Sequence, residues 1–165
     1  RDFFESQSLE LAYVEFGLRA VDFSIGNFQM KPSFAEQIEV HVTNSALRNQ
    51  YPHLELTQHS SADARKIRIE RLKSTPWQMT YLAAFIDILH VRFTFLNNET
   101  PTYRVAYMAA AYNLGIDATR SEIERWMQTP AFPDGKNAWT KQYAYAQIAL
   151  YYFENYAPKL FAISK

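Results

Sequence analysis

The stretch TPWQMTYLAAFIDILHVRFTFL, from Thr75 to Leu96, carries the clearest secondary-structure signal in this chain. A proline in its second position suits the first turn of a helix, because its fixed φ is helical and the amide hydrogen that it lacks has no partner there. Large apolar residues then recur at alternating spacings of four and three, at Leu82, Ile86, Leu89, Phe93 and Leu96. This period places them on one face of a helix. The stretch therefore predicts a central helix that buries an apolar stripe.

Helical patterns continue on both sides of this stretch. Pro32 and Pro101 each begin a segment with apolar residues at helical spacing, and Gly115 follows the second segment as a left-handed helix cap. Further helices are expected from a cap at Ser6 or Ser8 to about Ala20, after Ser60 or Ser61, over 119–128 and over 137–156. The chain has only four glycines and no long alternation of polar and apolar residues, which argues against a sheet. We predict an all-α fold.

The length of 165 residues suits one domain that buries roughly 70% of its unfolded surface, so we predict a single domain over residues 1–165. The chain begins at Arg1 without a methionine or an apolar leader, which we interpret as a processed or excised product. A further helix upstream of residue 1 is then one option. No apolar run approaches the ~18 residues that a membrane-spanning helix needs, so no membrane span is expected.

The charges of the chain balance. Lysine plus arginine and aspartate plus glutamate number 17 each, so the formal net charge is zero. Such a balance favours neither nucleic acid nor anionic lipid as a partner. The most basic stretch runs from Arg65 to Lys73 and is interrupted by Glu70, and we interpret it as a solvated helix face. We therefore expect no nucleic-acid partner.

The residue types that hold metals are sparse or scattered. Cysteine is absent, which excludes disulfides, thiolate catalysis and zinc–cysteine sites. The four histidines, His41, His53, His59 and His90, lack the spacing of a metal-binding motif. Nucleophile-elbow and phosphate-loop sequences do not occur either. We predict neither a metal nor a cofactor.

Two short segments carry the functional signal. The first, Gly26-Asn27-Phe28-Gln29-Met30-Lys31-Pro32-Ser33-Phe34-Ala35, joins a glycine, a side-chain amide and a proline-started helix at fixed spacing. The second, Ala110-Ala111-Tyr112-Asn113-Leu114-Gly115, places a phenol and an amide at the end of an apolar helix. Together they suggest a carbohydrate cleft.

The first segment reads G-x-x-Q-x-x-P-x-x-A and resembles the Gly-Leu-Met-Gln-x-x-Pro-x-Thr-Ala signature of bacterial soluble lytic transglycosylases, a lysozyme-like family that cleaves peptidoglycan. The second segment resembles that family's Ala-Ala-Tyr-Asn-Ala-Gly signature. The resemblance extends from about Ala20 to the aromatic helix after Trp139 and implies a single lysozyme-like helical domain. The departures from the two signatures are Asn27, Phe28, Phe34 and Leu114.

The resemblance also implies roles for five residues in substrate binding. Gln29 would donate its amide to the bound sugar or to the catalytic carboxyl, and Gly26 would let the loop approach the glycan closely. Phe28 would form an apolar shelf for a sugar. Tyr112 would hydrogen-bond near the catalytic acid, and Asn113 would bind a sugar substituent or brace the loop.

The chemistry needs a carboxylic acid whose pKa is raised by an apolar pocket, so that it can protonate the glycosidic oxygen near neutral pH. The resembled family uses one glutamate, at the end of a helix before the glutamine loop and followed by serine, and lets the sugar's own 6-hydroxyl attack. Glu5, Glu10 and Glu15 precede the loop here, and we interpret them as solvated helix charges. The acid is expected upstream of Arg1, with Glu10 and Glu15 as internal candidates. The absence of any acid stays open.

Each signal also has a purely structural interpretation. Tyr112 and Asn113 would finish a core helix, with Asn113 satisfying terminal carbonyls, and Gln29 would cap the helix of Pro32. Three tryptophans are available to stack on sugar faces, namely Trp77, Trp126 and Trp139. Core or interface packing is expected of the tyrosines near the end of the chain, namely Tyr143, Tyr145, Tyr151, Tyr152 and Tyr156.

Two functional predictions follow from these segments. The first is cleavage of peptidoglycan strands by a lytic transglycosylase-like mechanism with one glutamate as general acid and base. The alternative is a catalytically inactive lysozyme-like module that binds cell-wall glycan or a protein partner. The resemblance implies peptidoglycan or a related glycan as the partner and the bacterial cell envelope as the location. A third interpretation, a helical interaction protein, predicts no concave site between Gln29 and Tyr112.

Overall fold

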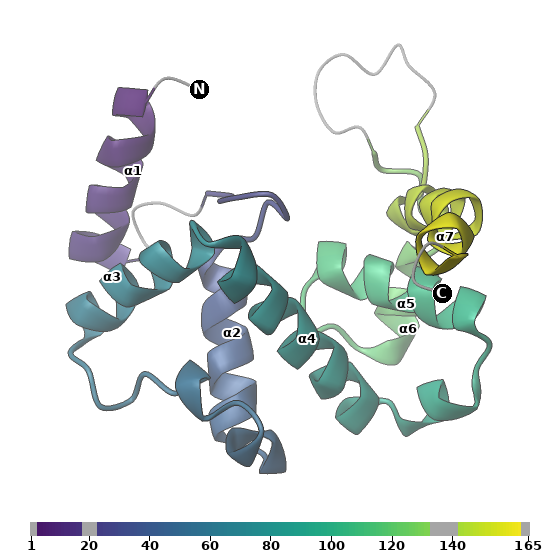
Figure 1. Ribbon diagram of the computed structural model, residues 1–165, viewed down its shortest axis with the longest axis horizontal. Coiled ribbons are helices and arrows are strands. Elements are labelled where there is room, and N and C mark those ends of the chain that lie inside the picture. The colour runs from purple at the N-terminus through teal and green to yellow at the C-terminus, as the bar shows by residue number, and fades with distance from the viewer. Residues whose placement is uncertain (1–2, 18–22, 133–141, 163–165) are drawn as a thin grey trace. The chain divides into compact units, whose positions relative to one another are not determined.

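The structure is a computed structural model that describes residues 3–17, 23–132 and 142–162 (Figure 1). In these ranges the regular structure is helical, and strand pairing is limited to two isolated bridges, Ile25 with Met30 and Phe132 with Tyr143. The prediction of an all-α fold is confirmed. The chain divides into two compact units, Arg1–Ile88 (unit 1) and Leu89–Lys165 (unit 2). The single domain over residues 1–165 stays a prediction.

Unit 1 contains the helices that precede the central helix and most of the central helix itself. They are α1 (Phe3–Phe16), α2 (Pro32–Thr43), η2 (Ala46–Asn49), η3 (Pro52–Leu54), α3 (Ser61–Leu72) and α4 (Thr75–Arg92), whose last turn belongs to unit 2. Helix α3 packs against both α1 and α2. The largest side chains that are completely buried in this core are Tyr13, Met30, Ile38, Leu54, Leu72, Tyr81 and Phe85.

Unit 2 continues from the end of α4 with η4 (Thr94–Asn98), α5 (Pro101–Leu114), α6 (Arg120–Trp126) and α7 (Tyr145–Ala162). Helix α5 packs against α6 and α7. Small residues on α5, Ala110 and Ala111, are completely buried and allow this close packing. The ring of Tyr107 meets those of Phe93 and Phe95 edge to face, each at 5.5 Å between ring centroids. Aromatic contacts therefore form much of this core.

Short-range signals set the starts of α2, α3 and α6 where they were expected. Pro32 stands in the first turn of α2. The Ser60 hydroxyl oxygen accepts a hydrogen bond from the backbone amide of Asp63 and caps α3. At the start of α6, Thr119 and Glu122 form a capping box in which each side chain bonds the backbone of the other.

The central helix differs from its prediction in its end and in its buried face. Helix α4 ends at Arg92, so Leu96 lies in η4. Leu89 and Leu96 are buried as expected, but Leu82 and Ile86 are only half-buried. The face that is buried carries Tyr81, Ala84, Phe85 and Ile88. Two large aromatic rings bury more apolar surface than Leu82 and Ile86 would, and they set the rotation of the helix.

The first and last helices also depart from their predicted bounds. Helix α1 already begins at Phe3, ahead of the predicted caps at Ser6 or Ser8, and residues 18–22 lie outside the described residues. Helix α7 begins at Tyr145, and residues 142–144 before it are not helical. The predicted start at residue 137 falls in the range 133–141, outside the described residues.

Candidate functional site

The first functional segment forms a tight turn ahead of α2. Ile25 and Met30 exchange two backbone hydrogen bonds, of 2.9 and 3.1 Å between nitrogen and oxygen, and close the intervening residues into a loop. Gln29 adopts a φ of 51°, a left-handed conformation that is uncommon outside glycine. Its side-chain amide nitrogen donates to the Gly26 carbonyl oxygen at 2.9 Å. The exposed Gln29 therefore does not cap α2, and its second amide hydrogen and its carbonyl oxygen suit a ligand.

Because Gly26 has no side chain, the Gln78 side chain of α4 lies close to its backbone. A Cβ at position 26 would lie 1.5 Å from Gln78 Nε2 and 2.8 Å from the Leu72 carbonyl oxygen. Gln78 is 1% exposed and donates to the carbonyl oxygens of Ile25 and Leu72. It also accepts the backbone amide of Phe28 at 3.0 Å. Sequence reasoning missed Gln78, and the only signal for it was an amide within an apolar helix.

Two of the residues that depart from the family signature, Asn27 and Phe28, lie on the same loop. The Asn27 side-chain amide donates to the Thr75 hydroxyl oxygen at 3.1 Å, which ties the loop to the first residue of α4. Phe28 is half-buried beside it. The predicted role of Phe28 as a sugar shelf stays a prediction, as does that of Gly26 toward a glycan.

The second functional segment is the last turn of α5 in unit 2. The exposed Asn113 accepts a hydrogen bond from the indole nitrogen of Trp126 at 2.8 Å. Burial, with a smaller contribution from Tyr145, raises the pKa of the half-buried Tyr112 to about 12. Tyr112 is therefore a neutral phenol at neutral pH. Gly115 ends the helix with a φ of 124° and a ψ of 149°, a conformation with positive φ that is not the left-handed cap we expected.

The two internal acid candidates lie on α1. The Glu10 carboxylate forms an ion pair with the Lys73 ammonium group at 2.7 Å. Burial lowers the pKa of Lys73, but hydrogen bonds with Glu10 and Glu70 outweigh it and raise that pKa. Glu15 is exposed. Neither carboxyl sits in the apolar pocket that a general acid needs, and their catalytic roles stay predictions.

Glu5 has a feature that Glu10 and Glu15 lack. It is followed directly by Ser6, and the resembled family places a serine after its acid. Its backbone belongs to α1, which precedes the glutamine loop as the acid-bearing helix of that family does. Sequence reasoning missed this signal, which makes Glu5 the strongest internal candidate.

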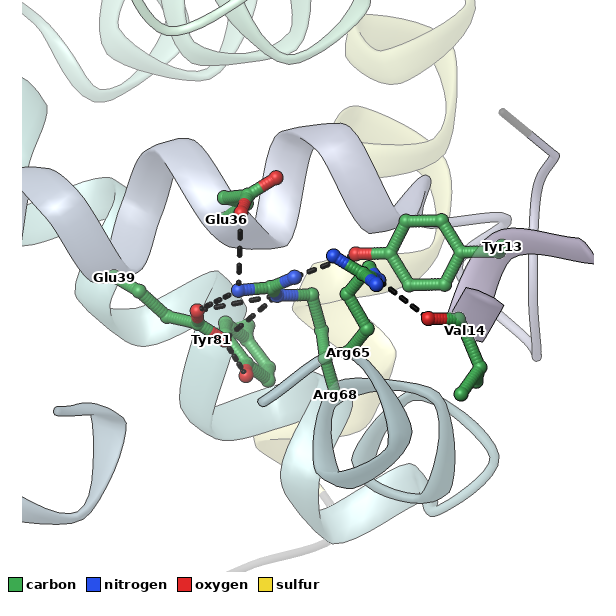
Figure 2. A network of polar contacts seen from close by, with 7 residues as sticks. All are labelled: Tyr13, Val14, Glu36, Glu39, Arg65, Arg68 and Tyr81. Atoms are coloured by element: carbon green, nitrogen blue, oxygen red, sulfur yellow. Dashed lines mark hydrogen bonds and ion pairs between the residues drawn. The ribbon is translucent and has the colours of Figure 1, made fainter. Parts of the chain in front are cut away.

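The most highly buried charges of the described residues form a network in unit 1 (Figure 2). Arg68 of α3, 3% exposed, binds both carboxylate oxygens of Glu39 of α2, which is 5% exposed. The Tyr81 hydroxyl donates to Glu39 at 2.5 Å, and the Tyr13 hydroxyl accepts from Arg68. Burial lowers the pKa of Arg68, but bonding to Glu39 raises it more, so the pKa lies above its usual value. Glu39 is thus a structural carboxylate whose oxygens are occupied.

This network corrects our interpretation of the basic stretch as a solvated face. Arg68 is buried because its charge is neutralised by Glu39. Arg65 is half-buried and donates to the backbone carbonyl oxygens of Val14 and Glu15 at the end of α1, at 2.7 and 3.2 Å. Three helices are therefore joined by side chains that a charge pattern alone assigns to the surface.

The tryptophans and late tyrosines differ in what they contact. Trp126 binds Asn113, Trp77 lies under a guanidinium group, and Trp139 lies outside the described residues. The tyrosines that project from the surface rather than into the core are Tyr143, Tyr151, Tyr152 and Tyr156. The core part of the prediction is therefore wrong for these four side chains, and their packing at an interface stays a prediction.

The described ranges contain neither a candidate membrane-spanning helix nor a candidate metal site. No helix there combines the length and the apolar character needed to cross a bilayer. No three histidine, aspartate or glutamate side chains in those ranges gather closely enough to hold a metal ion.

The two functional segments belong to different units, with Gln29 in unit 1 and Tyr112 in unit 2. Their convergence on one groove stays a prediction. Comparison with known protein families, curated proteins and solved structures finds no match to the chain. The lytic transglycosylase resemblance therefore stays a prediction as well.

Proposed function

We propose that this chain binds bacterial cell-wall glycan and cleaves it by a lytic transglycosylase-like mechanism. The observation that carries the proposal is the loop around Gln29. A non-glycine residue with a positive φ, held in an exposed and internally bonded turn, is the kind of strained position that concentrates at ligand-binding sites. Hydrogen bonds with Gln78 fix the loop, so the exposed side-chain amide of Gln29 is already positioned when a ligand binds.

The proposed reaction needs one acid and a neutral hydrogen-bond donor. A glutamic acid protonates the glycosidic oxygen, the 6-hydroxyl of the same sugar attacks its anomeric carbon, and the glutamate takes up the hydroxyl proton. The bond to the leaving sugar breaks and a 1,6-anhydro ring forms, so no water and no second carboxylate are consumed. Tyr112, with its pKa at about 12, remains a donor throughout the neutral range. Glu5 or a glutamate upstream of Arg1 supplies the acid.

Digestion of purified peptidoglycan tests this proposal. The chain, extended to its native start, is expected to release muropeptides with 1,6-anhydro ends that mass spectrometry detects. Glu5→Gln is expected to abolish release if Glu5 is the acid, while the control Glu15→Gln on the same helix leaves it unchanged. Release by Glu5→Gln at the parent rate excludes Glu5, and release that also persists in Glu10→Gln and Glu15→Gln assigns the acid to a residue upstream. No sugar release from the extended chain removes the cleavage proposal.

A binding module without catalysis is the second candidate. It is favoured by the surroundings of Glu10 and Glu15, since one is ion-paired and the other is exposed. This candidate predicts that the chain co-sediments with peptidoglycan without turnover. Chitooligosaccharides are then expected to shift the NMR signals of the Gln29 side chain and of Tyr112. Unmoved signals at both residues contradict glycan binding by the two segments.

A further inference from the structure

Unit 1 contains a pair of clefts that no part of the proposed reaction uses. One cleft has a volume of about 720 Å³ and lies beside α3 and the start of α4. The other, of about 510 Å³, lies beside η3 and the segment that follows it. His59, Arg71 and Trp77 line both. A ligand in either cleft therefore contacts the same guanidinium and indole groups.

The carboxylates that line these clefts already have partners. Asp63 accepts from Ser60 at 2.6 Å, Glu70 lies 3.2 Å from the Lys73 ammonium group, and Glu55 pairs with Arg48 at 2.7 Å. Each pairing is complete within unit 1. The acidic side chains at the clefts are therefore occupied by groups of the chain itself.

The cationic groups at the same clefts are in the opposite condition. Nη1 of Arg71 is buried and has no hydrogen-bond partner among the described residues. A buried donor without an acceptor is rare, because it loses its hydrogen bonds to water and gains none in return. The exposed Lys66 ammonium group likewise has no ion pair within the described ranges. The clefts therefore contain a guanidinium nitrogen and an ammonium group without acceptors, beside carboxylates that each have a hydrogen-bond or ion-pair partner in the described part of the chain.

The Arg71 guanidinium is also held in place. Its central carbon lies 4.4 Å from the centre of the Trp77 ring, which is a cation–π distance. It also hydrogen-bonds with the Tyr81 side chain, and this bond and its charge oppose the rise in the pKa of Tyr81 that burial and Glu39 cause. A fixed guanidinium loses little conformational entropy when it binds an anion.

We propose that these clefts bind the carboxylate of an acidic sugar, with the carboxylate on Arg71 and the sugar ring beside Trp77. Guanidinium groups pair with carboxylates through parallel hydrogen bonds, and an indole gives the apolar side of a sugar ring a flat surface. The carboxylate part of this inference depends on hydrogen bonds from Arg71 and on charge attraction from Lys66, which line the same cleft. The sugar part rests on the proposed function, since in bacterial cell-wall glycan the acidic unit is a muramic acid that carries a lactyl carboxylate.

Two sugars that differ only by this lactyl group test the inference. N-acetylmuramic acid, N-acetylglucosamine and lactate are titrated separately into the ¹⁵N-labelled chain, and the Trp77 indole signal is followed by NMR. N-acetylmuramic acid is expected to bind about tenfold or more tightly than N-acetylglucosamine, the size of one charge-assisted hydrogen bond. Lactate is expected to bind more weakly than N-acetylmuramic acid, because it has no ring to lie beside Trp77.

Substitutions then assign the effect to Arg71. Arg71→Gln is expected to lower the affinity for N-acetylmuramic acid about tenfold, to that of the uncharged sugar. Arg125→Gln removes the same charge from an exposed position on α6 and is expected to leave affinity unchanged. Lys66→Gln, at an exposed position where folding is not at risk, is expected to lower affinity about two- to threefold through lost charge attraction alone.

Several outcomes overturn the inference. Equal affinity for the two sugars removes the carboxylate part, and so does unchanged affinity in a folded Arg71→Gln. If Arg71→Gln does not fold, unchanged affinity in Lys66→Gln has the same meaning. Lactate binding as tightly as N-acetylmuramic acid removes the sugar part. Gln29→Ala separates this inference from the proposed function, because it is expected to weaken glycan cleavage without changing the affinity for N-acetylmuramic acid at Arg71.

Discussion

The two units of this chain are stabilised by different means. Within the described ranges, the buried polar and charged side chains are Glu39, Arg68 and Gln78, and all three belong to unit 1. The buried side chains of unit 2 are aliphatic and aromatic, with Tyr107 at the centre of a group of rings. The core of unit 1 therefore depends on paired polar side chains, with Nη1 of Arg71 as an exception, and unit 2 depends on the fit of apolar surfaces.

This difference predicts which amino-acid substitutions each unit tolerates. A buried ion pair contributes little net stability relative to an apolar pair of the same size, but removal of one partner leaves an uncompensated charge. An apolar core loses stability in proportion to the volume removed. The same type of substitution is therefore expected to have unequal effects in the two units.

The largest effect is expected from breaking the buried ion pair of unit 1. Arg68→Met leaves the Glu39 carboxylate buried without its cation and is expected to lower the free energy of unfolding by about 3–5 kcal/mol. Urea unfolding followed by circular dichroism measures the loss. The control is Arg48→Met, whose exposed pair with Glu55 is expected to contribute about 1 kcal/mol or less. Equal losses in the two variants contradict a structural role for the buried pair.

The next effect concerns the support of the glutamine loop. Gly26→Ala places a Cβ where Gln78 Nε2 now lies, so Gln78 is displaced from the carbonyl oxygens that it binds. The expected loss is about 1–3 kcal/mol of unfolding free energy, the range for overpacking a filled site. In unit 2, Gly115→Ala is strained by a φ of 124°, against 70° at Gly26, but nothing lies within 4 Å of the added Cβ. Unchanged stability in Gly26→Ala contradicts this account of the loop.

Arg68→Met and Gly26→Ala act on contacts that could not be predicted from the sequence. Helix starts were predictable, because Pro32 and the Thr119–Glu122 capping box act through neighbours within three positions. The Glu39–Arg68 pair joins residues 29 positions apart on two helices, and no periodic pattern marks such a contact. A charge in a basic stretch looks solvated until its partner is known.

The candidate site was predictable to a similar extent. The motif spacing located the Gln29 turn and the Tyr112 helix end, both of which exist as local structures. Gln78, which holds the turn, is about fifty positions away from it along the chain, and the sequence gives no pairing signal for it. The rotation of α4 that buries Tyr81 instead of Leu82 depends on packing, which the four-three spacing of apolar residues does not specify.

A smaller effect, limited to alkaline pH, is expected from Tyr112. Its pKa is raised from 10.0 to about 12 by burial, so the unfolded phenol ionises before the folded one as pH rises. The stability that depends on the neutral phenol is complete below pH 10 and is lost as pH rises toward 12. Urea unfolding at a series of pH values from 9 upward measures this loss, and Tyr112→Phe is expected to reduce its slope. An identical slope in the variant contradicts burial as the cause.

The smallest effect is expected at Tyr107, and the same type of substitution, tyrosine to phenylalanine, compares the two units. The Tyr107 hydroxyl of unit 2 is buried and has no hydrogen-bond partner in the described part of the chain, so Tyr107→Phe is expected to change stability by less than about 1 kcal/mol, in the stabilising direction. In unit 1 the Tyr81 hydroxyl donates to the buried Glu39, so Tyr81→Phe removes a charge-assisted bond and is expected to cost about 1.5–3 kcal/mol. Thermal and urea unfolding of the two variants compare a ring that only packs with a ring that also satisfies a charge. A loss at Tyr107 as large as that at Tyr81 shows that unit 2 also depends on polar pairing, and it removes the distinction between the units.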